Sequence, residues 1–134
     1  MRVIKFFILK WLIIASVTTI VVIVLSHIPQ DNMPEEIQNN NYDKLQHIFA
    51  YGIITLFFIL SLRNSFSLLS AVILFFSILV IATLDEVTQP FVNRQASLLD
   101  WFADMIGITG VLFSFFFFEG SKRQAFANTK NLRA

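Results

Sequence analysis

The segment FSLLSAVILFFSILVIATL, from Phe66 to Leu84, contains no charged residue. Three further apolar segments lie along the chain, with the bounds Phe6–Ser26, Leu45–Leu62 and Trp101–Phe118. Each segment has roughly the 17 to 25 residues that a helix needs to cross a bilayer, and the two shorter segments can gain a flanking turn from Asp43–Lys44 or Leu98–Leu99. Backbone groups in lipid must bond internally, which favours helices. The sequence therefore predicts an all-α fold, with residues 1–134 forming one bundle of four transmembrane helices.

The composition supports a membrane protein. Hydrophobic residues make up 56% of the chain and charged residues 14%, whereas a soluble domain carries about 25% charged residues. Cysteine is absent, which excludes disulfides, thiol catalysis and thiolate metal sites. The basic start, with Arg2 and Lys5, also fits a secretory signal, but the apolar run is long and no small-x-small cleavage site follows Ser26. We therefore expect an uncleaved first helix.

The basic residues predict the orientation, because lysine and arginine near helix ends stay on the cytoplasmic side. With four crossings, one side receives Arg2, Lys5, Lys10, Arg63, Lys122, Arg123, Lys130 and Arg133. The other side receives only Lys44 and Arg94, together with every acidic residue except Glu119. We expect both termini to be cytoplasmic in a multi-pass protein of the cell membrane.

A first polar cluster leads into the second apolar segment. Asp43, His47 and Tyr51 follow one another at a spacing of four, so they lie on one helical stripe, and Lys44 lies beside them. Ionisable residues at this depth usually face a bundle interior or a wet cavity. The stripe indicates a functional site, although a purely structural interpretation is also open, in which His47 bonds Asp43 and Tyr51 anchors the membrane interface.

A second polar cluster connects the third and fourth segments. Glu86 and Gln89 share a face of the last helical turn before Pro90, which cannot continue the helix. Ser97 and Asp100 have the spacing of a capping box, in which the serine hydroxyl accepts from a free N–H and the carboxylate is favoured by the helix dipole. Both pairs are expected on the outer side.

Arg94 and Asp104 are not explained by helix capping. Arg94 lies in a loop beside a helix N-terminus, where it could help to hold an anion or form an ion pair with Glu86, Asp100 or Asp104. Two small residues follow in the same helix, Gly107 and Gly110. Such residues let a neighbouring helix approach, so we assign both glycines to packing.

These residues together resemble the VanZ-like family of small polytopic membrane proteins. The resemblance covers most of the chain from Asp43 to Gly110 and rests on Asp43, Lys44, His47, Tyr51, Glu86, Gln89, Phe91, Arg94, Ser97, Asp100 and Gly107. The family commonly has asparagine at the position of Asp104, and often glycine beside the arginine, where this chain has Asn93 and Gln95. The resemblance implies a four-helix membrane fold and a cell-envelope setting, and its name-giving member is linked to glycopeptide (teicoplanin) resistance. It implies no reaction.

Three functions remain open. The first is a polar binding site at the extracytoplasmic face for an envelope lipid, a lipid-linked cell-wall precursor or a glycopeptide, formed by Lys44, Tyr51, Gln89, Arg94, Ser97 and Asp104. The second is an envelope enzyme acting on a lipid-linked substrate, with His47, Asp43, Glu86 and Asp100 as acid/base groups. The third is a non-catalytic structural subunit. Transport is disfavoured, because the inner halves of the segments hold almost no ionisable residues.

We expect membrane lipids as partners and neither a cofactor nor a nucleic acid. A single histidine among carboxylates can bind a divalent cation through nitrogen and oxygen. No HExxH or clustered-histidine motif is present, however. The sequence alone therefore predicts no metal site.

Overall fold

A computed structural model describes the backbone of residues 2–29, 31 and 40–131, and the side chains of residues 6–29, 31, 42–63 and 65–119. Its helices are α1 (Arg2–Ser26), α2 (Asn40–Leu62), α3 (Leu68–Thr88) and α4 (Leu98–Asn131). No strand occurs in these ranges. The predicted all-α fold is confirmed.

The observed helices differ from the predicted segments mainly at their ends. The flanking residues Asp43–Lys44 and Leu98–Leu99 do extend α2 and α4. Helix α3 starts at Leu68, because the Ser67 hydroxyl accepts from the backbone N–H of Ser70 and the Ser70 hydroxyl accepts from that of Ser67. This reciprocal capping fixes the start of the helix. At the other end, Pro90 lies in a short 3-10 helix, η3 (Gln89–Val92).

All four helices contain a stretch long and apolar enough to cross a membrane. These stretches are Phe6–Ser26, Tyr42–Leu62, Leu68–Val92 and Leu98–Glu119. Large apolar side chains lie exposed on every helix, for example Phe6, Phe49, Leu68 and Phe113. An exposed apolar surface of this extent suits contact with lipid rather than water. The structure thus supports a multi-pass membrane protein.

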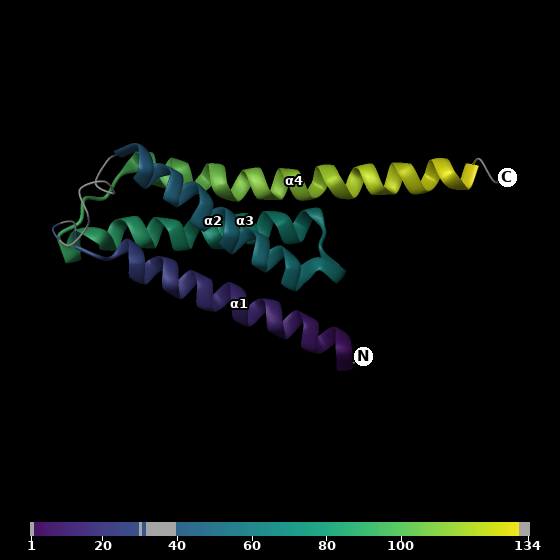
Figure 1. Ribbon diagram of the computed structural model, residues 1–134, viewed down its shortest axis with the longest axis horizontal. Helices are drawn as coiled ribbons and strands as arrows, with labels where there is room; N and C mark the ends of the chain where they lie inside the picture. The colour runs from purple at the N-terminus through teal and green to yellow at the C-terminus, as the bar shows by residue number, and fades with distance from the viewer. Residues whose placement is uncertain (1, 30, 32–39, 132–134) are drawn as a thin grey trace.

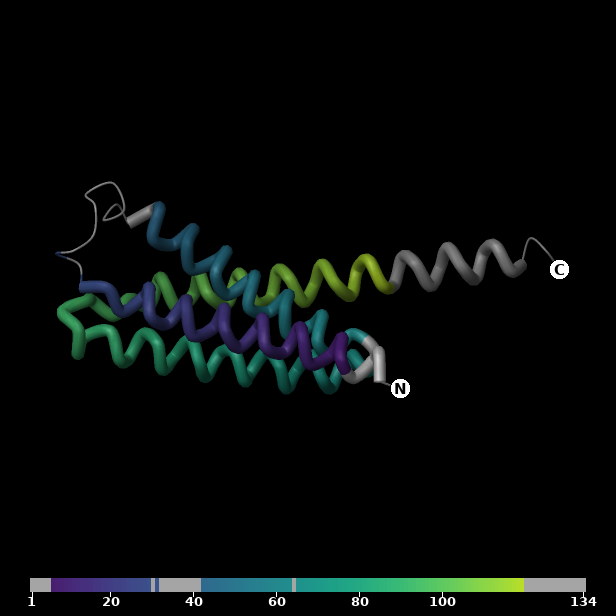
Figure 2. The backbone as a smooth tube through the Cα atoms, turned by 60° about the horizontal axis from the view of Figure 1, so that its bottom comes forward, coloured from purple at the N-terminus to yellow at the C-terminus, as the bar shows by residue number. Residues whose placement is uncertain are grey.

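The helices run lengthwise through the molecule, and Figure 1 shows how their connections divide between its two ends. Helix α1 begins at the same end as the turn between α2 and α3, which contains the 3-10 helix η2 (Arg63–Ser65). The α3–α4 connection lies at the opposite end, where α1 ends and α2 begins (Figure 1), and Figure 2 shows the same arrangement from a second side. Both polar clusters of the sequence are therefore brought to one end of the bundle.

Helix α2 is central to the packing, since its most extensive contacts are with α4 and then with α1. The buried core includes Tyr51, Ile54, Ile59, Leu74, Ile78, Ile108 and Leu112. Helices α2 and α4 meet closely at Gly107, where an added Cβ would collide with the Ile48 carbonyl oxygen and lie 3.0 Å from the Gly52 nitrogen. The packing role predicted for Gly107 is confirmed. The same prediction for Gly110 is wrong, because no residue of another described helix lies within 4 Å of a Cβ added there.

Candidate functional site

Residues from all four helices converge at the end of the bundle that holds the α3–α4 connection. The buried polar side chains gathered there are Ser26, His47, Asp85, Glu86, Gln89, Asp100 and Asp104. The sequence predicted an outer polar site from the second to fourth apolar segments. The structure brings those predicted residues together and adds Ser26, His27, Asp85 and Thr88.

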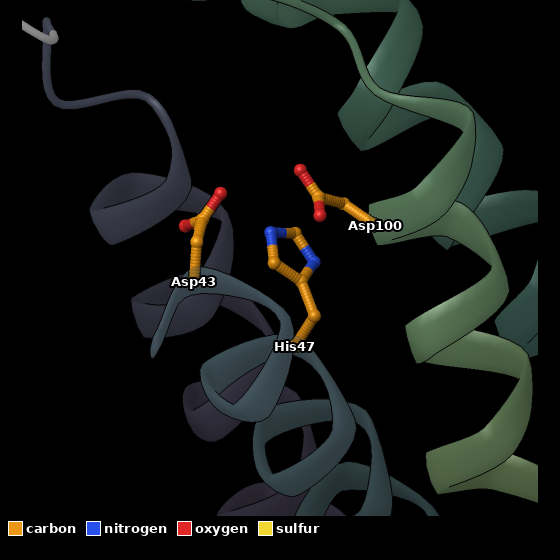
Figure 3. Close-up of side chains that lie close together, drawn as sticks. All are labelled: Asp43, His47 and Asp100. Atoms are coloured by element: carbon orange, nitrogen blue, oxygen red, sulfur yellow. The ribbon is translucent and has the colours of Figure 1, made fainter. Parts of the chain in front are cut away.

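His47 lies in the centre of this polar cluster, held by a carboxylate of α4. Its Nδ1 is 2.8 Å from Asp104 Oδ1, and the two residues are 6% and 0% exposed. The other edge of the imidazole ring faces the carboxylates of Asp43 and Asp100 (Figure 3). The sequence had paired His47 with Asp43 along one stripe of α2, whereas the observed hydrogen bond crosses to α4.

Arg94 joins α1 to α2. Its Nη2 donates to Asp43 Oδ1 at 2.8 Å, and its Nη1 donates to the Ser26 carbonyl oxygen at 2.9 Å. The ion pair that the sequence left open was with Glu86, Asp100 or Asp104, but the observed partner of Arg94 is Asp43. A loop arginine therefore fixes the end of α1 against the start of α2.

Glu86 caps α4 from the neighbouring helix. Its Oε2 accepts from the Ser97 backbone N–H at 2.8 Å, and its Oε1 accepts from Gln89 Nε2 at 3.3 Å. The Ser97 hydroxyl accepts from the Asp100 backbone N–H at 3.3 Å, so the serine half of the predicted capping box is confirmed. In the other half, Glu86 takes the place expected for the Asp100 carboxylate.

The carboxylate of Asp100 is consequently free to turn into the polar cluster. Its Oδ1 lies 3.4 Å from Lys44 Nζ, and Asp100 is 4% exposed. The carboxylate faces His47 in Figure 3. A residue predicted partly for its capping role is thus positioned beside the central histidine.

A second network surrounds Asp85, which was not among the candidate site residues. Its Oδ1 accepts from the Ser26 hydroxyl at 2.5 Å, and its Oδ2 accepts from the Tyr51 hydroxyl at 3.2 Å. Tyr51 is completely buried, so it does not anchor the membrane interface. His27 Nδ1 lies 3.4 Å from Asp85 Oδ1, and His27 Nε2 is hydrogen-bonded to the Thr88 hydroxyl at 2.9 Å. Both residues could have been noticed in the sequence, because each is an ionisable residue directly after an apolar segment: His27 follows the first segment and Asp85 follows the third.

Two overlapping sets of side chains could hold a metal ion. One consists of Asp43, His47 and Asp100, and the other of His47, Glu86 and Asp104. In each set, one potential ligand atom per residue lies within 4.8 Å of the others. Both include His47, and the sequence alone had predicted no metal site.

A groove of about 470 Å³ opens beside the polar cluster, between α1 and α2. Its apolar lining comprises Val22, Leu25, Leu45, Phe49 and Ala50. Its polar lining includes Ser26, Asp43, His47 and Arg94. The groove is therefore amphipathic, with charged groups next to an apolar wall.

Comparison of the chain with models of protein families, with curated proteins and with solved structures found no match.

Proposed function

We propose that this chain is a multi-pass protein of the cell membrane that binds an amphipathic, lipid-linked envelope ligand at the extracytoplasmic end of its bundle. The observation that carries the proposal is the groove between α1 and α2, which joins an apolar wall to a charged end. Ligand sites are typically apolar with a few placed polar groups, and a volume of this size is within their usual range of roughly 300 to 1,000 Å³.

The apolar wall suits a hydrocarbon chain, because the side chains of α1 and α2 that form it are themselves exposed at the surface of the bundle. Leu25 and Phe49, which line the groove, are 53% and 66% exposed. A lipid tail can therefore enter sideways from the bilayer without crossing a polar surface.

The charged end suits an anionic head group. A guanidinium has five N–H donors, and the bonds of Arg94 to Asp43 and Ser26 use two of them. Arg94 also lines the groove, so its further donors can bind a phosphate. Lys44, 25% exposed in its side chain, supplies a second cation at this end.

The setting is inferred from the sequence. The excess of lysine and arginine at the opposite end supports an extracytoplasmic position for the polar end and cytoplasmic termini. The resemblance to the VanZ-like family supports a role in the cell envelope and connects this ligand class with glycopeptide resistance. A lipid-linked cell-wall precursor fits both observations.

Binding can be tested with undecaprenyl phosphate as the probe and the purified protein in phospholipid nanodiscs. We expect a saturable complex by native mass spectrometry, and at least tenfold weaker binding after Ala50→Phe, because the larger side chain fills the groove. Val80→Phe is the matched control, since Val80 is exposed on α3 and does not line the groove. Equal affinity of the wild type and Ala50→Phe would contradict the proposal.

An enzyme is the second candidate, favoured by the contact between His47 and Asp104. A histidine oriented by a buried carboxylate is a common general base, and here it lies beside Asp43 and Asp100 (Figure 3). In the same nanodiscs, an enzyme would hydrolyse the phosphoanhydride bond of a polyprenyl diphosphate with water, releasing polyprenyl phosphate and inorganic phosphate. His47→Gln should then abolish turnover while probe binding persists. If the wild type binds the probe without turnover, the enzyme hypothesis is excluded for this substrate and the chain acts as a binding protein.

A further inference from the structure

The polar end of the bundle holds more buried negative charge than its basic residues can balance. The five carboxylates gathered there among the described side chains are the buried Asp85, Glu86, Asp100 and Asp104 and the partly buried Asp43. The basic residues beside them are Lys44 and Arg94, and even with both histidines, His27 and His47, charged the carboxylates remain in excess. Uncompensated charge is costly in a membrane interior, so these carboxylates require either protons or a further cation.

The His47 ring is oriented as a metal-binding histidine would be. Histidines that bind metals usually donate one ring N–H to a carboxylate, which leaves the other nitrogen unprotonated for the metal. His47 Nδ1 is bonded to Asp104 Oδ1 at 2.8 Å. The opposite nitrogen points between the carboxylates of Asp43 and Asp100 (Figure 3). The contact with Asp104 therefore favours the tautomer whose lone pair faces two anionic oxygens.

The carboxylates around His47 are incompletely satisfied. Asp100 Oδ1 and Asp104 Oδ2 are buried and have no hydrogen-bond partner among the described residues. The nearby Lys44 Nζ lies 3.4 Å from Asp100 Oδ1, which is beyond a good charged hydrogen bond. Buried polar atoms are normally hydrogen-bonded, so the Asp100 carboxylate beside His47, whose Oδ1 has only the long ion pair with Lys44, is able to bind a further cation.

We propose that Asp43, His47 and Asp100 bind one divalent transition-metal cation, with Asp104 positioning the histidine. A set of one nitrogen and two oxygens favours zinc or manganese over magnesium, which prefers oxygen alone. The three ligand atoms already lie within 4.8 Å of one another. Two atoms bound to zinc are about 3.4 Å apart, so small side-chain rotations close the site.

Three protein ligands leave a coordination position open for water or another ligand. Asp43 and His47 also line the groove between α1 and α2, and the open position can therefore be reached from it. The metal site does not depend on the proposed lipid ligand, because its evidence is the charge excess, the His47–Asp104 contact and the unpaired oxygens. The two proposals can fail separately.

The test is calorimetric titration of chelator-treated, detergent-solubilised protein with Zn²⁺. We expect one ion per chain and a rise in Tm on binding. Asp100→Asn and His47→Gln should each weaken binding at least tenfold, and Asp104→Asn should weaken it 10- to 100-fold through loss of histidine positioning. His27→Gln is the matched control, because it removes the other histidine, which lies in neither set of potential ligands, and it should bind as the wild type does.

Misfolding is separated from loss of ligands by the Tm without metal and by the absorption spectrum of bound Co²⁺, which reports its coordination. A variant that keeps the metal-free Tm but loses the Tm shift and the Co²⁺ spectrum supports the assignment. No Zn²⁺ binding by the wild type would overturn it. Equal losses in His27→Gln and His47→Gln would also overturn it. Zinc binding without undecaprenyl phosphate binding would refute the proposed function and retain the metal site.

Discussion

Asp85 is 2% exposed and joins three helices through a single carboxylate. It lies on α3 and accepts hydrogen bonds from Ser26 of α1 and Tyr51 of α2. A carboxylate in an apolar surrounding is stabilised only if its oxygens are paired. Both oxygens of Asp85 are paired, so this residue acts chiefly in fixing the helices, in contrast to the incompletely paired Asp100 and Asp104.

Tyr51→Phe should lower the free energy of unfolding by about 0.6 to 2 kcal/mol, because it removes one donor from the buried Asp85 carboxylate. Tyr42→Phe is the matched control, since Tyr42 lies on the same helix and is 59% exposed. Its effect should be within about 0.5 kcal/mol of zero. The free energy of unfolding of both variants can be measured in mixed micelles. Equal effects of the two substitutions would show that the Tyr51–Asp85 hydrogen bond does not stabilise the bundle.

At the scale of the helices, the close contact between α2 and α4 determines where the site residues meet. Gly107 lies against the backbone of α2 near Ile48 and Gly52. His47 and Asp104 each lie within one turn of this contact, so the approach of the two backbones allows their 2.8 Å contact. Backbone packing and site geometry are therefore coupled.

Gly107→Ala should destabilise the protein by about 1 to 3 kcal/mol, because the new methyl group requires α2 and α4 to separate. Gly110→Ala makes the same chemical change one turn later, where nothing lies within 4 Å. That variant should be neutral or stabilised by up to about 1 kcal/mol through helix propensity. Thermal unfolding in detergent distinguishes the two variants. If both melted at the same temperature, the close contact of Gly107 with α2 would not limit the packing of the bundle.

At the scale of the whole molecule, the connections place the two polar clusters at one end and the α2–α3 turn at the other (Figure 1). Gln95 and Ser65 are exposed residues at these two ends. The lysine and arginine distribution predicts that the end with Gln95 lies outside the cell. This orientation determines which membrane face can supply the ligand.

Single cysteines test the orientation directly, since the chain has none of its own. We expect Gln95→Cys to react with a membrane-impermeant maleimide in intact cells. Ser65→Cys should react only after the membrane is permeabilised. Labelling of Ser65→Cys alone in intact cells would invert the proposed topology and place the polar site in the cytoplasm.

The sequence by itself determined the properties that depend on local chemistry. Hydropathy predicted the four helices. The shared face of Glu86 and Gln89 and the helix cap at Ser97 could also be predicted, because each of these interactions spans only a few residues of the chain. The Asp43–His47–Tyr51 stripe likewise marked α2 as the helix that carries the central histidine.

Only the tertiary structure decided the partners across helices. It paired His47 with Asp104, Arg94 with Asp43, and Tyr51 with Asp85. It also supplied the groove between α1 and α2. The reason is physical: an isolated helix fixes which residues share a face, but a partner on another helix depends on how both helices are rotated and how closely they pack. In this chain, that packing includes the glycine contact between α2 and α4.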